Sequence, residues 1–280
     1  MTAQVTESAV GHAAAVAAAA AGTAGVRIEA ARDPGRLHAV SELLGQVWGT
    51  SPAQSPLAPD VLRAIAHAGG IVHVAYGATG LVGAAAAIFG PPASRSLYSL
   101  AAAARRSDRG VGFALKQAQR AWSLGHGVTS IAWTFDPLVS RNARFNLVKL
   151  GAVAREYTVD FYGRLYDQVN RDDETDRLTV LWELTSHRAT MAAQGLPLPD
   201  DAPQVLEAFL RAPDGGPLAV RDEHALWCRA PEDIVALRHR NPDQAARWRT
   251  AVRDVLVPAF AKGLVAVAMT RDGWYRLENP

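Results

Sequence analysis

The stretch from Arg105 to Val153 constrains the fold of this chain more than any other. A short glycine turn, Arg109-Gly110-Val111-Gly112-Phe113-Ala114, leads into a pattern that predicts a helix as far as Gly125. In such a turn, backbone N–H groups converge at the positive end of the helix dipole, which suits a phosphate or pyrophosphate. A buried strand at 131–135 and a second helix ending at Gly151 complete a compact unit. This order of elements predicts a cofactor site.

The rest of the chain supplies further strands and helices around this unit. Alternating and continuous apolar runs predict strands at 26–30, 71–76, 81–89, 96–104, 128–135, 152–159 and 178–184. Helical periodicity and cap residues predict helices at 33–48, 59–68, 112–125 and 139–150. The strand at 96–104 is rich in alanine, and its small side chains allow another group to approach the backbone closely.

Both ends of the chain differ in character from this middle part. Residues 1–24 are Ala-rich with neither a basic start nor a hydrophobic face, so we expect a disordered tail and no signal peptide. Residues 25–186 form the expected main domain. Residues 187–280 are expected to form a small α/β extension, which includes a linker at 196–204. We expect helices there at 205–210, 231–240 and 243–262, the last kinked or split at Pro258, a strand at 224–229 and a closing hairpin at 265–277.

Composition excludes several classes of protein. The net charge of +2 gives no case for nucleic-acid binding, and no apolar run is long enough for a membrane span. Cys228 is the single cysteine, expected to be packed, which fits a cytoplasmic protein. The histidines lack metal-ligand spacing, so we expect no metal. The basic residues between Arg238 and Arg249 alternate with other polar residues, which favours a solvated helix face.

The glycine turn resembles the signature of the GNAT-type acyl-CoA N-acyltransferase superfamily. That signature is Gln or Arg, two residues, Gly, one residue, then Gly or Ala, and Arg109, Gly112 and Ala114 fill it. The run IAWTFDPLVSRNARFNLVKLGA is similar to an uncharacterised bacterial subgroup. The resemblance implies an α/β (α+β) fold with a mixed, mostly antiparallel central sheet flanked by helices, followed by the C-terminal α/β extension.

The resemblance also implies which residues hold acetyl-CoA or another acyl-CoA as co-substrate. Backbone amides from Gly110 through Val111 and Gly112 to Ala114 would hold the pyrophosphate, with charge added by Arg109. The pantetheine arm would lie along the strand at 96–104. Asn142 would hydrogen-bond the arm, although the family's usual Asn aligns with Ser140. Leu147 stands where the family commonly has a Tyr that protonates the leaving thiolate, which puts the general acid in doubt.

The chemistry of acyl transfer selects the remaining candidates. Either Leu100 or Ala101 could offer a backbone N–H to the thioester oxygen. Asp160 is the candidate general base. Two interpretations stay open for Asp136, which is either a group at the ligand-binding end of a strand or a helix cap. Tyr98 is either an acid or a core residue.

We therefore expect an acyl-CoA-dependent N-acyltransferase that moves an acetyl or short acyl group to a small-molecule amine. The alternative is a non-catalytic acyl-CoA-binding or regulatory module with the same fold, because Leu147 leaves the usual acid missing. We expect neither a nucleic acid nor a membrane as partner, and a homodimer is one assembly that the sequence allows.

Overall fold

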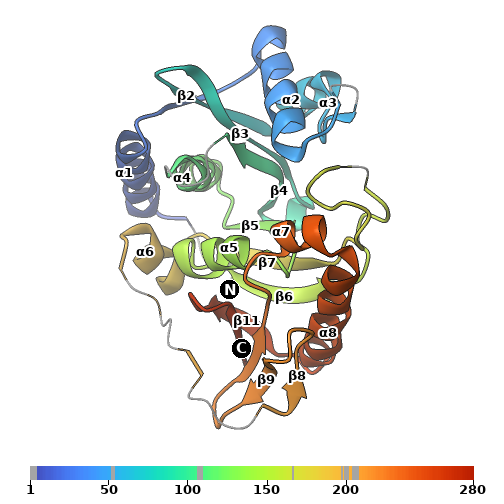
Figure 1. The fold of residues 1–280 in the computed structure, drawn as a ribbon. Coiled ribbons are helices and arrows are strands. Elements are labelled where there is room, and N and C mark those ends of the chain that lie inside the picture. Colours follow the sequence, from blue (N-terminus) through green and yellow to red (C-terminus); the bar gives the residue numbers. More distant parts are fainter. Residues whose placement is uncertain are drawn as a thin grey trace. The chain divides into compact units, whose positions relative to one another are not determined.

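Figure 1 shows the computed structural model of the chain, which describes residues 5–51, 54–105, 110–165, 167–196, 198, 202–203 and 208–280. Arg109, the predicted pyrophosphate contact, lies outside these residues. The chain divides into two compact units, one of Met1–Trp133 with Glu183–Ser186 and the other of Thr134–Trp182 with His187–Pro280. The domain boundary expected at residue 187 stays a prediction, because the compact units follow a different division.

Among the described residues, the first unit contains five paired strands. Its elements in chain order are α1 (Glu7–Thr23), β1 (Arg27–Ala30), α2 (Pro34–Trp48), α3 (Pro59–His67), β2 (Ile71–Gly77), β3 (Gly80–Phe89), a short 3-10 helix η2 (Pro92–Ser94), β4 (Ser96–Ala104), α4 (Val111–Gly125) and the greater part of β5 (Ser130–Phe135). The strands pair in sequence order, antiparallel from β1 to β4 and then parallel between β4 and β5.

Helices cover both faces of this sheet (Figure 1). The α2 and α3 helices bury their apolar residues against Val72, Val74 and alternate alanines of β3 and β4. The opposite face, which includes Ala75 and Ala85, packs against Val111 and Leu115 of α4. The α2 helix begins as its sequence predicts, with the Asp33 side chain accepting a hydrogen bond from the Arg36 N–H at 3.0 Å.

The expected N-terminal tail is instead a helix where the structure describes it. The α1 helix spans Glu7–Thr23, is capped by the Thr6 side chain, and packs against α4. Alanine has the highest helix propensity, and its small side chain allows two helices to approach closely. Ala13 accordingly has no exposed surface. The expectation failed because we required a strongly apolar face for docking, whereas an Ala-lined face is enough.

The described part of the second unit contains seven further paired strands. Its elements are α5 (Ser140–Arg144), a π-helical turn η3 (Phe145–Lys149), β6 (Val153–Thr158), β7 (Arg177–Glu183), α6 (His187–Ala193), β8 (Leu210–Arg211), β9 (Pro217–Arg221), β10 (Leu226–Arg229), α7 (Ile234–Arg240), α8 (Pro242–Ala261), β11 (Val265–Met269) and β12 (Trp274–Glu278). The strand order is β7-β6-β11-β12-β10-β9-β8, with antiparallel pairing throughout.

The C-terminal part differs in detail from the sequence-based expectations. The helix expected at 205–210 falls partly outside the described residues, and Leu210 lies in β8 rather than in a helix. The α8 helix continues through Pro258 to Ala261 without splitting, although the proline removes the intrahelical bond that an N–H at position 258 would donate to the Asp254 carbonyl. The expected fold class, a mixed α/β chain with a mostly antiparallel sheet, is confirmed. No helix of the described residues is long and apolar enough to cross a membrane.

Candidate active site

The two parallel strands of the first unit form a fork. The register between β4 and β5 joins Ser96 to Ser130, Leu97 to Ile131 and Tyr98 to Ala132. Within the described residues, β4 has no register partner in β5 beyond Tyr98, although it continues to Ala104. Backbone groups on that edge of β4 are therefore positioned to bind an extended ligand in the manner of an added strand.

A β-bulge lies immediately after the fork. Ala87 of β3 is in register with Ser99, while the preceding Ala86 is in register with Ala101. Leu100 is therefore the extra residue of β4 and has no partner in β3. Such bulges re-aim the backbone and are frequent beside functional sites. The two residues predicted to present an N–H to a thioester oxygen, Leu100 and Ala101, are thus at the bulge itself.

The glycine turn opens α4 as predicted. Gly110 adopts a left-handed conformation (φ 78°), which favours glycine, and the first helical residue is Val111. Gly110 has no side chain to cap the helix, so the first-turn N–H groups of Val111 and Gly112 donate no hydrogen bond to the cap residue. Ala114 is buried and its N–H bonds to the Gly110 carbonyl at 2.9 Å. Ala114 therefore serves the helix rather than a ligand.

A buried polar cluster joins α4 to both strands at the fork. The Lys116 Nζ donates to the Ser99 Oγ at 2.9 Å, and the Ser99 hydroxyl in turn lies 3.3 Å from the Gln119 Oε1. The same Nζ lies 3.8 Å from the centroid of the Trp133 ring, within the range of a cation–π contact. Burial lowers the pKa of Lys116 to about 7, so near neutral pH the amine is present in both protonation states.

The sequence did not point to this cluster. Lys, Gln and Arg side chains are mostly exposed in proteins, yet Lys116, Gln119 and Arg120 are at most 4% exposed. Tyr98, the predicted acid or core residue, is half-buried on β4 in register with Ala132.

The Asp136 carboxylate in the second unit is enclosed by two arginines. Arg249 donates to both of its oxygens at 2.8 and 3.1 Å, and Arg238 donates at 2.6 Å. Both guanidinium groups also bind Asp173 at 2.8 Å. Burial alone would raise the pKa of Asp136, but Arg249 and Arg238 outweigh burial and hold that pKa well below its usual range. A carboxylate held in this way is a poor general base.

This arrangement changes two of our sequence-based interpretations. Asp136 accepts the Leu138 N–H at 2.9 Å, but α5 has Val139 as its N-cap residue with no side-chain cap, so the helix-cap interpretation is wrong. Arg238 and Arg249 are 3% and 1% exposed, so the solvated helix face is also wrong for these two residues.

The candidate base Asp160 organises a turn in the second unit. Its Oδ1 accepts hydrogen bonds from the N–H and the hydroxyl of Thr175, both at 3.1 Å. The Asp160 N–H donates to Asp176, whose carboxylate also binds Arg253 and the Tyr157 hydroxyl. Asp160 is exposed and has a positive φ of 46°. These contacts stabilise the loop between β6 and β7, so its role as a base stays a prediction.

Asn142 and Leu147 also lie in the second unit. Asn142 is exposed on α5. Leu147 is fully buried in the π-helical turn, so the position where the family commonly has an acid belongs to the core here. Cys228 is fully buried as well, and burial raises the pKa of its thiol, which agrees with the packed interpretation. Among the described residues, no group of three His, Cys, Asp or Glu side chains could hold a metal ion.

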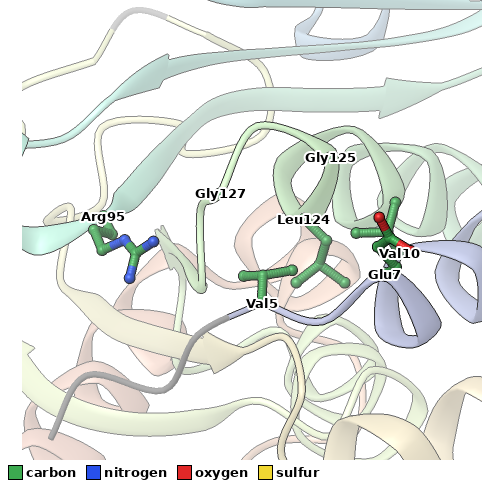
Figure 2. Close-up of a pocket in the computed structure, with 7 residues that line it drawn as sticks. All are labelled: Val5, Glu7, Val10, Arg95, Leu124, Gly125 and Gly127. Atoms are coloured by element: carbon green, nitrogen blue, oxygen red, sulfur yellow. The ribbon is translucent and has the colours of Figure 1, made fainter.

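A cleft of about 420 Å³ lies elsewhere on the first unit (Figure 2). Val5, Val10 and Glu7 line it from the start of the chain, and Leu124 with its neighbours lines it from the end of α4. None of the predicted site residues lies in this cleft.

Three comparisons relate the chain to known proteins. No family model matches it, and no curated protein matches it. Among solved structures, a putative GNAT-family acetyltransferase from Desulfovibrio desulfuricans is 17% identical, with a TM-score of 0.47, and the match covers 57% of this chain and 99% of that one. An N-acetyltransferase from Staphylococcus aureus is 14% identical, with a TM-score of 0.46 and coverage of 57% and 99%.

A third match has a bound cofactor. It is a putative acetyltransferase from Salmonella typhimurium with acetyl-CoA, 14% identical, with a TM-score of 0.47, and the match covers 58% of this chain and 96% of that one. All three solved structures are described as acetyltransferases, the first and third as putative ones, and the first is described as a member of the GNAT family. The likeness is partial, so the function is inferred below from this chain's own residues.

Proposed function

We propose that this chain is an acyl-CoA-dependent N-acyltransferase that transfers an acetyl or short acyl group to a small-molecule amine. The observation that carries the proposal is the fork between β4 and β5 with its bulge at Leu100. Along the chain, this fork is followed directly by a left-handed glycine turn at the start of α4. An unpaired strand edge suits an amide-containing arm, and uncapped helix N–H groups suit a pyrophosphate.

Different residues of the first unit would bind different parts of the acyl-CoA. The N–H groups of Val111 and Gly112 would bind phosphate oxygens, with Arg109 supplying charge. The edge of β4 beyond Tyr98 would pair with the pantetheine amides. The N–H of Leu100 or Ala101 would then bind the thioester oxygen, because the bulge frees this part of the strand from regular pairing.

A second candidate function is a non-catalytic acyl-CoA-binding module. The second unit supports it, because Leu147 is buried, Asp136 is enclosed by arginines and Asp160 stabilises a loop. None of these three groups is placed like a typical acid or base. The two functions share one ligand and differ in turnover.

Calorimetry and thiol release together test both functions. Wild-type protein titrated with CoA and acetyl-CoA should bind both, and a panel of primary amines should then release free thiol from acetyl-CoA. Binding without thiol release favours the module, and absence of binding contradicts both functions. Gly112→Val should weaken CoA binding by placing a branched side chain at the turn. The matched control Gly125→Val, at the other end of α4 where a Cβ would meet nothing within 4 Å, should bind normally.

A further inference from the structure

Lys116 lies at the point where the two strands separate. Ser99 follows Tyr98, the last residue of β4 that is paired with β5, and Trp133 follows Ala132, the last paired residue of β5. The Lys116 amine contacts both, the hydroxyl of Ser99 at 2.9 Å and the ring of Trp133 at 3.8 Å. A single buried side chain from α4 therefore contacts the first residue of each arm of the fork.

The Ser99 hydroxyl and the Lys116 amine lie within the distance at which a base can remove a hydroxyl proton. In the structure the amine donates to Ser99 at 2.9 Å and the Ser99 hydroxyl donates to the Gln119 Oε1 at 3.3 Å, so the neutral amine acts as the base only once the hydroxyl turns from Gln119 to Lys116. A hydroxyl becomes a useful nucleophile when a base within hydrogen-bond reach can remove its proton, and Ser–Lys pairs are a known form of this arrangement. A lysine surrounded by apolar and neutral groups loses its preference for the charged form. Ser99 and Gln119 contribute neutral polar atoms, Trp133 contributes a ring, and the adjacent Arg120 donates to the Leu184 carbonyl instead.

Gln119, the third member of the cluster, has a hydrogen-bond donor that is unpaired in the described part of the chain. The Gln119 Oε1 lies 3.3 Å from the Ser99 hydroxyl, whereas its Nε2 is buried and has no hydrogen-bond partner among the described residues. An unpaired buried amide donor is costly, so it calls for an explanation in terms of a missing ligand or strain. An acyl group attached to Ser99 would bring a carbonyl oxygen next to Gln119.

We propose that Ser99 is an acyl acceptor of this protein, with Lys116 as its base, and that the acyl group passes through an ester at Ser99. In the first half, the Ser99 Oγ attacks the thioester carbonyl, the Oγ–C bond forms and the C–S bond breaks. Lys116 takes the hydroxyl proton and passes it to the leaving thiolate, which replaces the acid that Leu147 cannot supply. In the second half, the amine attacks the ester, the C–Oγ bond breaks, and a proton returns to Ser99. The inference rests on the proposed acyl-CoA binding.

The test uses acetyl-CoA and the full chain without any amine. We expect intact-mass analysis to show one added acetyl group per chain, peptide mapping to place it on Ser99, and free thiol to appear in equal amount. Exchange of labelled CoA into acetyl-CoA should also occur without an acceptor, which detects the ester even where it hydrolyses quickly. Ser99→Ala should abolish both signals, and Lys116→Met should slow them by about 10²- to 10⁴-fold, the usual effect of removing a general base.

Controls separate this inference from the proposed function. Ser123→Ala removes another buried hydroxyl of the first unit, one that bonds to the Gln119 carbonyl at 2.6 Å, and should label like wild type. Calorimetry should show that Ser99→Ala still binds acetyl-CoA. An acetyl group on Lys116, or neither label nor exchange in protein that binds acetyl-CoA, overturns the inference and leaves the proposed function standing. Absence of acetyl-CoA binding overturns both.

Discussion

Gly83 of β3 lies directly beneath the first turn of α4. A Cβ at Gly83 would lie 2.9 Å from the Val111 Cγ1, 3.0 Å from the Ala103 carbonyl oxygen and 3.1 Å from a Leu115 methyl group. The β3 strand thus packs closely against the start of α4, beside the turn that we assign to the pyrophosphate. A larger residue at position 83 must therefore displace the Val111 and Leu115 side chains, the Ala103 carbonyl or the start of the helix.

Gly83→Ala should therefore weaken both the fold and CoA binding. Overpacking of this kind typically costs about 1–3 kcal/mol, to be measured by urea unfolding, and calorimetry should show weaker CoA binding. Gly125→Ala in α4, where a Cβ meets nothing within 4 Å, should leave both unchanged or increase stability slightly. Normal CoA affinity in a destabilised Gly83→Ala would separate the turn from the ligand and contradict our assignment.

Around this turn, the bounds of the helix and strand could be predicted from the sequence more accurately than the direction in which their side chains point. The strand at 96–104 and the helix ending at Gly125 have the predicted bounds within a residue, because glycine and proline breaks on either side fix them. The direction of the polar residues of α4 was not predicted. Amphipathicity indicates a solvent-facing side only when nothing else covers it, and here both β4 and α1 pack on α4.

Contacts between residues far apart in the chain also could not be predicted from the sequence. Asp136 meets Arg238 and Arg249, more than 100 residues away, and no local pattern predicts such a pairing. Arg238 and Arg249 were predicted to be solvated because the spacing of basic residues along a helix does not indicate which distant residues they will contact. Short strands such as β8, which has only two residues, give too brief an alternation to recognise.

The enclosed Asp136 carboxylate should make the second unit sensitive to acid. Its pKa lies below the unfolded value of about 3.9, so its contribution is fully present above that value and is lost as the pH falls through the folded pKa. Asp136→Asn should cost about 3–5 kcal/mol at neutral pH, because it leaves two buried arginines short of a partner. The difference from wild type, measured by urea unfolding, should shrink below about pH 4.

A surface pair provides the comparison for this prediction. Asp172 bonds to Arg164 at 2.9 Å, but both side chains are about two-thirds exposed. Asp172→Asn should change stability by less than about 1 kcal/mol at any pH, since water and salt screen such pairs. An Asp136→Asn variant that behaves like Asp172→Asn would show that the cluster contributes little.

Lys116 should make the free energy of unfolding change with pH in the neutral to alkaline range. Burial lowers its folded pKa from 10.5 to about 7. Between these two values the unfolded chain binds more protons, so stability should rise with pH, by up to about 1.4 kcal/mol per pH unit. Lys116→Met should remove this slope, while Lys149→Met, at an exposed position, should retain it. Equal slopes in wild type and Lys116→Met, measured by urea unfolding from pH 7 to 10, would contradict a buried amine.

The N-terminal helix offers the last prediction. Ala13 and Ala14 are neighbours in α1 with equal helix propensity, but Ala13 has no exposed surface whereas Ala14 is exposed. Ala13→Arg must either bury an unpaired charge or separate α1 from the rest of the first unit, so it should lower stability by several kcal/mol. Ala14→Arg should change stability by less than about 0.5 kcal/mol. Thermal unfolding of the two variants measures the difference directly. Equal melting temperatures would show that residues 7–23 behave in solution as the disordered tail that their composition first suggested.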